Sequence, residues 1–260
     1  MISSNSLRAG LGAVAWFAIA ATCMNAQSKS TQGAMNIVLV HGAWADGSSW
    51  SKVIPRLKVR GFNVTAVQLP MTSIADDVAT TARALALQNG PVLLVGHSYG
   101  GVVITQAGSD PKVTGLLYVA AYAPDDGESA MTLAYRYPTP IDSQIVADSS
   151  GFLKLTPDGI TEDFAPDLSE VEKQVLTATQ GPWSYVAFST AVNAPAWKSK
   201  PTWFVVAAND RVISPVLEAM EAQNMHATTI TLPTSHVAML AKPESVASFI
   251  AEAAHSLAKE

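Results

Sequence analysis

The sequence predicts an α/β fold in which about six mostly parallel strands form a sheet with helices on both faces. From Met35 onward, short apolar runs alternate with segments of helical periodicity, as expected of successive β-α-β units. With 260 residues, 48% of them hydrophobic and 14% charged, the chain has the composition of a globular protein. Its length suits one well-buried core better than two.

The individual elements follow from these patterns in chain order. We expect strands at 36–40, 63–69, 92–95, 115–121, 202–207 and 228–232. We expect helices at 49–60, 73–89, 101–109, 215–224 and 243–259. The last two helices carry start signals, since Ser214 precedes Pro215 and Lys242 precedes Pro243.

The alternation of strands and helices stops between Asp125 and about Ala196. This stretch is rich in Pro, Asp, Ser and aromatic residues, and 168–180 within it has a helix-forming composition. An unstructured loop of that length is uncommon in a compact domain. We therefore expect residues 27–260 to form one domain with an inserted cap at about 125–196.

Residues 1–26 have the pattern of a signal peptide. Arg8 is the only charged residue before an apolar run at 11–21, and the segment ends with the small residue Ala26. The run is short for a membrane span. We expect cleavage, export to the periplasm or the medium, and no stable membrane span in the mature form. A retained membrane anchor is the alternative, whereas Cys23 lies in a poor lipoprotein motif because Thr22 precedes it.

Charge and cysteine content exclude several functions. The net charge of −5 comes without a Lys/Arg cluster, which argues against a nucleic-acid partner. Cys23 is the only cysteine, so the mature chain has no disulfide, no cysteine nucleophile and no thiolate metal site. The five histidines are not clustered. The sequence indicates neither a metal nor an organic cofactor, and it gives no oligomeric state.

Residues 92–101 contain the strongest functional motif. A buried strand runs into Gly96-His97-Ser98-Tyr99-Gly100, which is G-x-S-x-G, and a helix follows. This strand-turn-helix context is that of a nucleophile elbow, whose strained turn exposes the serine hydroxyl. The sequence therefore predicts Ser98 as a nucleophile.

A serine nucleophile needs a base and an acid, which follow it in this kind of fold in the order Ser, acid, His. Asp210 and His236 each follow a late strand, at the carboxyl edge of the sheet where Ser98 also lies. Asp125 and Asp126, after the fourth strand, remain an alternative for the acid.

Other polar residues have structural interpretations. His226 and His255 are expected at the surface, His41 and His97 are expected to support loops, and Asp76 and Asp77 lie at a helix start.

The oxyanion formed by nucleophilic attack on a carbonyl needs two backbone N–H donors. We expect one from Tyr99, directly after the nucleophile, and one from Ala43, in the His41-Gly42 turn after the first strand.

Together these motifs resemble the α/β-hydrolase superfamily, and within it plant-type methylesterases, hydroxynitrile lyases and related bacterial serine esterases. The resemblance covers the mature chain and rests on His41-Gly42-Ala43-Trp44, Trp50, the elbow, Asp210 and the segment from Ser235 to Leu240. It implies the α/β-hydrolase fold. The hydroxynitrile lyases carry Thr and Lys where this chain has Gly42 and Val237, and epoxide hydrolases and dehalogenases carry Asp in place of Ser98, so these reactions are disfavoured.

The expected function is hydrolysis of small to medium, partly apolar carboxylic esters through an acyl-enzyme, with a small-molecule ester as the partner. Trp44, His97 and Trp183 are candidates for substrate binding. The same triad also suits lactone or amide hydrolysis and cofactor-free haloperoxidase or perhydrolase chemistry. A ligand-binding protein on a hydrolase scaffold is a further alternative.

Overall fold

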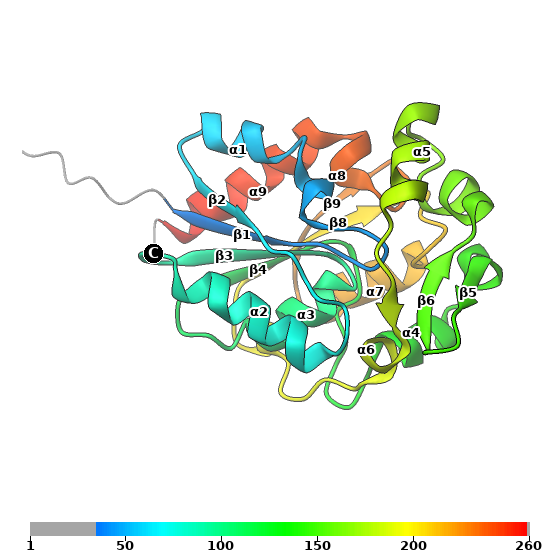
Figure 1. The fold of residues 1–260 in the computed structure, drawn as a ribbon. Helices are drawn as coiled ribbons and strands as arrows, with labels where there is room; N and C mark the ends of the chain where they lie inside the picture. The colour runs from blue at the N-terminus through cyan, green and yellow to red at the C-terminus, as the bar shows by residue number, and fades with distance from the viewer. Residues whose placement is uncertain (1–34, 259–260) are drawn as a thin grey trace, which may run out of the picture. The chain divides into compact units, whose positions relative to one another are not determined.

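The computed structural model describes residues 35–258, which contain a six-stranded parallel sheet of order β2-β1-β3-β4-β8-β9 (Figure 1). Its strands are β1 (Asn36–Val40), β2 (Asn63–Ala66), β3 (Val92–Ser98), β4 (Val113–Ala121), β8 (Thr202–Ala207) and β9 (Thr228–Leu232). The predicted α/β class with a mostly parallel six-stranded sheet is confirmed.

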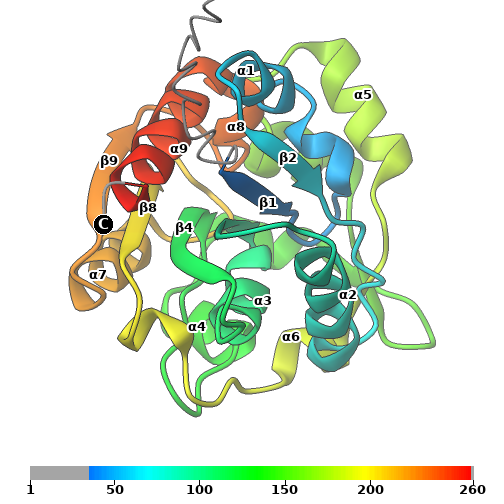
Figure 2. The same ribbon diagram turned by 90° about the vertical axis from the view of Figure 1, so that its left-hand side faces the viewer.

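Helices cover both faces of this sheet. Helices α1 (Ile54–Val59) and α9 (Pro243–Leu257) pack together on one face, and α2 (Ile74–Ala86) and α3 (Gly100–Ala107) pack together on the other (Figures 1 and 2). Helix α7 (Pro215–Asn224) packs on β8. Because both faces are covered, every residue of β1, β3 and β8 is buried, which explains their continuous apolar sequences.

Some boundaries differ from the predicted ones. The single helix expected at 49–60 is divided into a 3₁₀ turn, η1 (Gly47–Trp50), and α1, which has Pro55 in its first turn. The strand expected at 63–69 ends at Ala66, where its pairing with β1 ends. A short helix, α8 (Ala238–Ala241), was not predicted.

Between β4 and β8 the chain leaves the main sheet. We call residues 122–201 the insert; it includes the stretch where the sequence predicts a cap. A three-stranded antiparallel sheet of order β5-β6-β7 lies within it. Its elements are α4 (Ala130–Arg136), η2 (Pro140–Gln144), β5 (Ile145–Ala147), β6 (Phe152–Leu155), the π-helical turn η3 (Gly159–Phe164), α5 (Glu170–Thr179), β7 (Trp183–Ser184), α6 (Tyr185–Ser189) and η4 (Ala196–Lys198).

The predicted signal peptide, residues 1–26, lies outside the described residues and stays a prediction. Among helices in the part that is described, none combines the length and the apolar character that crossing a membrane requires.

Candidate active site

Ser98 lies at the sharp turn between β3 and α3. Its φ is +56°, in the left-handed region that residues other than glycine rarely adopt, and the pairing of β3 with β4 shifts register between His97 and Ser98. Such backbone strain is typically found at functional sites. Helix α3 begins at Gly100, so its N-terminal N–H groups carry partial positive charge close to Ser98.

Two glycines make this turn sterically possible. A Cβ atom at Gly96 would lie 2.6 Å from the carbonyl oxygen of Gly100, and one at Gly100 would lie 2.6 Å from the carbonyl oxygen of His41. These neighbours are backbone atoms that cannot rotate away. The first and last positions of G-x-S-x-G therefore have to be glycine for α3 to pack this closely against β3 and the end of β1.

Asp210 and His236 form a buried hydrogen-bonded pair. His236 Nδ1 donates to Asp210 Oδ2 at 2.6 Å, and neither side chain is exposed to solvent. The other carboxylate oxygen of Asp210 accepts the backbone N–H groups of Val212 (2.7 Å) and Ile213 (3.1 Å). These three hydrogen bonds offset the cost of burying the carboxylate and fix its orientation.

The opposite ring nitrogen of His236, Nε2, is buried and has no hydrogen-bonding partner within residues 35–258. His97 donates its Nε2–H to the backbone carbonyl of His236 at 3.0 Å, and the two rings lie 4.7 Å apart. The residue preceding Ser98 thus anchors the loop that carries His236. The described residues contain no hydrogen bond between Ser98 Oγ and the imidazole of His236.

His41 and His97 are buried and neutral. Burial lowers the pKa of His41 and lowers that of His97 well below its ordinary value. His41 donates Nδ1–H to the carbonyl of Gly42 (2.8 Å) and accepts the backbone N–H of Leu69 at Nε2 (2.9 Å). Both rings therefore hold loops in place, which agrees with their predicted supporting role.

A small cavity of about 20 Å³ lies at Ser98, with room for about one water molecule. We call it the Ser98 cavity. Ala43, Trp44, Tyr99 and Trp183 line it together with Ser98, so the structure gathers these predicted site residues, whereas His97 is not part of the lining. A Cβ atom at Gly42 would lie 3.0 Å from Ser98 Oγ, which shows how closely the loop with Ala43 passes the serine.

The insert also contacts the loop of His236. The ring of Phe164 lies 5.2 Å from that of His236, and the Asp167 carboxylate accepts the backbone N–H of Ser235 at 2.8 Å and also its hydroxyl. The residue before His236 is therefore tied to the residues that precede α5. The sequence gives no local signal for these contacts, since Asp167 and Ser235 are 68 positions apart.

Two buried carboxyl groups, Asp77 and Glu218, contact residues of the site from the interior of the protein. Asp77 accepts the hydroxyl of Tyr99 (2.8 Å) and the N–H of Met71 (2.8 Å), and burial raises its pKa to about 6. Glu218 is fully buried in α7 and accepts the N–H of Ala207 (2.9 Å). Burial, and then the negative charge of Asp210, raise the pKa of Glu218 well above its ordinary value.

The alternative acids lie elsewhere. Asp125 pairs with Lys198, and Asp126 accepts the backbone N–H of Ala194, both on the surface of the insert. Neither contacts His236. In the described part of the chain, no group of three or more His, Cys, Asp or Glu side chains is arranged to hold a metal ion.

Comparison with known proteins identifies the family of this chain. The model of the alpha/beta hydrolase family matches residues 37–249. The chain belongs to the alpha/beta hydrolase family. Among solved structures, a pyrethroid hydrolase superposes with a TM-score of 0.73 at 24% identity, covering 86% of this chain and 98% of its own. Polyneuridine aldehyde esterase gives a TM-score of 0.74 at 18% identity, with 85% and 99% covered. At these identities the similarity shows the hydrolase fold alone.

Curated relatives within this hydrolase family include named esterases. The carbendazim hydrolyzing esterase of Nocardioides sp. is 33% identical over 114 residues, which are 38% of this chain and 46% of that protein. Methylesterase 7 of Arabidopsis thaliana is 34% identical over 105 residues, 34% and 40% of the two chains. The matches thus span less than half the length of each of these relatives.

The sequence motifs indicated the candidate residues at the carboxyl edge of the sheet, but they did not indicate the two buried carboxyl groups that contact this site. Asp77 was interpreted as a helix-start residue, whereas its carboxyl holds the Tyr99 side chain. Glu218 has no polar motif around it, and its proximity to Asp210 follows from the packing of α7 on β8.

Proposed function

We propose that this member of the alpha/beta hydrolase family is a serine esterase that cleaves carboxylic esters through an acyl-enzyme. The observation that carries the proposal is the buried hydrogen bond of 2.6 Å from His236 Nδ1 to Asp210 Oδ2. It leaves Nε2 of His236 without a partner among the described residues, on a loop anchored by the residue next to Ser98. The named esterases among the relatives support the same reaction class.

In the proposed mechanism, His236 Nε2 takes the proton from Ser98 Oγ as the oxygen attacks the ester carbonyl carbon. Asp210 holds the imidazole in the tautomer with Nδ1 protonated and stabilises the imidazolium that forms. His236 then protonates the leaving alcohol. In the second half-reaction it deprotonates a water molecule, which attacks the acyl carbon and releases Ser98.

The backbone N–H groups of Ala43 and Tyr99 are the proposed donors to the oxyanion. Both residues line the Ser98 cavity, and Tyr99 begins the turn into α3. The hydroxyl of the Tyr99 side chain donates to Asp77 instead, so the proposed oxyanion donor is the backbone N–H of Tyr99. Donors fixed in this way favour the transition state because they need no reorganisation as charge develops.

Hydrolysis by the purified protein tests this proposal. A panel of p-nitrophenyl esters from acetate upward should be cleaved by the wild type. Ser98→Ala and His236→Gln should each abolish the activity while the circular dichroism spectrum stays that of the folded wild type, and His236→Gln should also lower the thermal midpoint because it removes the buried hydrogen bond to Asp210. A folded wild type that cleaves no ester in the panel would contradict the proposal, as would a folded Ser98→Ala variant with wild-type activity.

A further inference from the structure

Residues 163–167 of the insert contact both loops that carry the proposed acid and base, and we call them the clamp segment. Arg211, directly after the acid, donates its Nε–H to the Asp163 carboxylate at 2.7 Å. At the other end of the segment, the Asp167 carboxylate accepts the backbone N–H of Ser235, directly before the base, at 2.8 Å. The clamp segment thus joins the loop of the acid to the loop of the base.

Phe164, within the clamp segment, packs against the imidazole of the base itself. Its ring is 1% exposed and lies 5.2 Å from that of His236. The ring of His97, at the end of the main sheet, lies 4.7 Å from the same imidazole. Because side chains in a protein interior are closely packed, these two neighbouring rings restrict the rotation of the imidazole.

Ser235 depends on the clamp segment for its hydrogen bonds. It is 3% exposed, and the Asp167 carboxylate accepts both its backbone N–H and its hydroxyl. A buried donor that loses its partner costs free energy unless the backbone moves to find another one. Since His236 is the next residue in the chain, such a movement would displace the imidazole.

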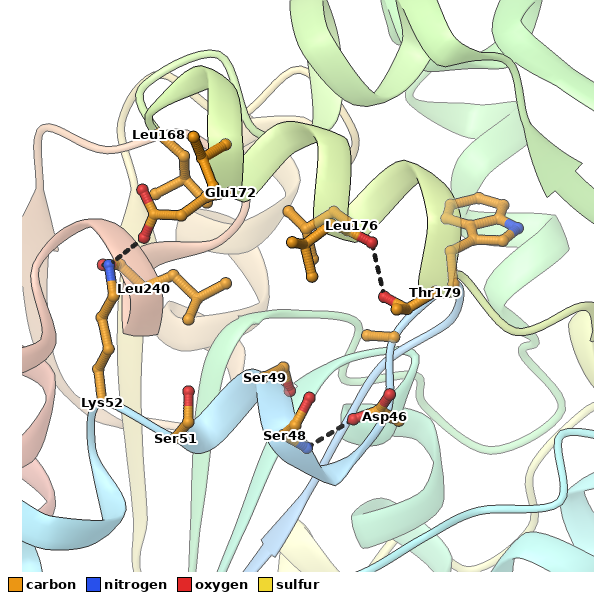
Figure 3. A pocket seen from close by; sticks show the side chains of 14 residues that line it. Asp46, Ser48, Ser49, Ser51, Lys52, Leu168, Glu172, Leu176, Thr179 and Leu240 are labelled. Atoms are coloured by element: carbon orange, nitrogen blue, oxygen red, sulfur yellow. Dashed lines mark hydrogen bonds and ion pairs between the residues drawn. The ribbon is translucent and has the colours of Figure 1, made fainter.

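Helix α5 follows the clamp segment and is not anchored by a buried side chain. No residue of α5 is buried, and a groove of about 210 Å³ lies between it and η1 (Figure 3). Val171 and Val175 line this groove and are 70% and 55% exposed. The polar contacts near the start of α5 are therefore important for its position.

One of these contacts connects α5 with the chain on the other side of His236. Lys52 Nζ pairs with Glu172 of α5 at 2.5 Å and donates to the carbonyl of Leu240 at 3.0 Å (Figure 3). Leu240 belongs to α8, the helix that follows His236. The region at the start of α5 thus holds the chain before His236 directly, and the chain after it through Lys52.

We propose that Asp167 of the insert is a positioning residue, which acts through Ser235 to hold His236 where its imidazole takes the proton of the nucleophile. Proton transfer needs such precision, because a misplacement of about 1 Å costs about 10²-fold in rate. This inference rests on the proposed esterase function and gives the insert a role in proton transfer.

Three variants test this positioning role. Asp167→Ala removes both hydrogen bonds to Ser235. Asp167→Asn is the conservative variant, because its amide oxygen can accept the N–H of Ser235 while its NH₂ group donates to the hydroxyl. Asp126→Ala is the matched control. Asp126 is also an exposed carboxylate of the insert, and it also accepts a backbone N–H from a residue 68 positions away, that of Ala194 at 2.7 Å.

We expect Asp167→Ala to lower kcat on p-nitrophenyl acetate by about tenfold to 10²-fold with KM little changed, because a displaced base destabilises the transition state and not the bound substrate. Asp167→Asn should recover most of this loss, and Asp126→Ala should keep wild-type kcat. Circular dichroism at the assay temperature checks that each variant is folded. Wild-type kcat in Asp167→Ala, or a loss confined to KM, would overturn the proposal.

Ser235→Ala tests the same contact from its other side and also serves if Asp167→Ala does not fold. It removes only the hydroxyl hydrogen bond, so the loss in kcat should be smaller, about threefold to tenfold. The double variant should be no slower than Asp167→Ala, because both substitutions remove the same link. Wild-type kcat in Ser235→Ala, or losses that multiply in the double variant, would contradict action through Ser235.

Proton NMR separates this inference from the proposed function, because it needs no turnover. The His236 Nδ1 proton, in its hydrogen bond of 2.6 Å to Asp210, should give a low-field resonance that is assigned by its loss in His236→Gln. The resonance should shift or broaden in Asp167→Ala and stay unchanged in Asp126→Ala. If the wild type cleaves no ester but the resonance responds in this way, Asp167 positions His236 and the esterase function fails. If esters are cleaved but Asp167→Ala changes neither kcat nor the resonance, the positioning role fails.

Discussion

Gly42→Ala should disable the site while changing only one methyl group. A Cβ atom at Gly42 would lie 2.5 Å from Ser98 Cβ and 3.0 Å from the carbonyl oxygen of His97. Ordinary carbon–carbon contacts are about 3.5 Å or longer, so the loop or Ser98 has to move by about 1 Å. The loop carries Ala43, a proposed oxyanion donor. A misplacement of about 1 Å costs about 10²-fold in rate, and we expect a loss of that size in kcat/KM.

The assay is steady-state hydrolysis of p-nitrophenyl acetate, with thermal unfolding measured in parallel. Gly181→Ala is the matched control, because the nearest heavy atom to its new Cβ would be the carbonyl oxygen of Ala45, 4.0 Å away. Gly181→Ala should keep wild-type kcat/KM. If Gly42→Ala is as active as Gly181→Ala, the loop is not held against Ser98 as described, and the reasoning is refuted.

Three further predictions concern the carboxyl groups around the site. Asp210→Asn should lower kcat on p-nitrophenyl acetate by about 10⁴-fold, because it favours the wrong tautomer of His236; a folded variant with wild-type kcat would contradict this. Burial raises the folded pKa of Asp77 to about 6, so its contribution to stability is present below its unfolded pKa and is lost as pH rises through the folded one. Urea titrations from pH 4 to 7 should therefore show Asp77→Asn gaining stability relative to wild type as pH rises, and a constant difference would argue against a raised pKa. The pKa of Glu218 is also raised in the folded protein, so wild type should lose stability relative to Glu218→Gln as pH rises above the unfolded pKa of Glu218 and through the folded one, and parallel stability–pH curves would contradict this.

The main sheet could be predicted from the sequence because its strands carry local signals. Strands such as β1 and β8 are buried on both faces and are continuous apolar runs, and they begin and end where the sequence indicates. The nucleophile elbow could also be predicted from the sequence. The close approach of α3 to β3 requires glycine at Gly96 and Gly100, and these two glycines are part of the recognisable motif. Chain order then selected Asp210 and His236, which the structure joins by a hydrogen bond.

The insert and the groups behind the site could not be predicted in this way. Its strands β5, β6 and β7 are two to four residues long, too short for a periodic pattern, and they pair antiparallel within the insert. The contact of Phe164 with His236 joins residues far apart in the chain. The groove beneath α5 depends on the packing of two such distant segments, so no local motif indicates it.

Covalent labelling tests the central claim, that Ser98 is the nucleophile of a serine esterase, most directly. The purified protein is treated with a fluorophosphonate, and the modified residue is located by peptide mass spectrometry. We expect one stoichiometric adduct on Ser98 in the wild type and none in Ser98→Ala. A folded wild type that stays unmodified, or an adduct that persists in Ser98→Ala, would contradict the account.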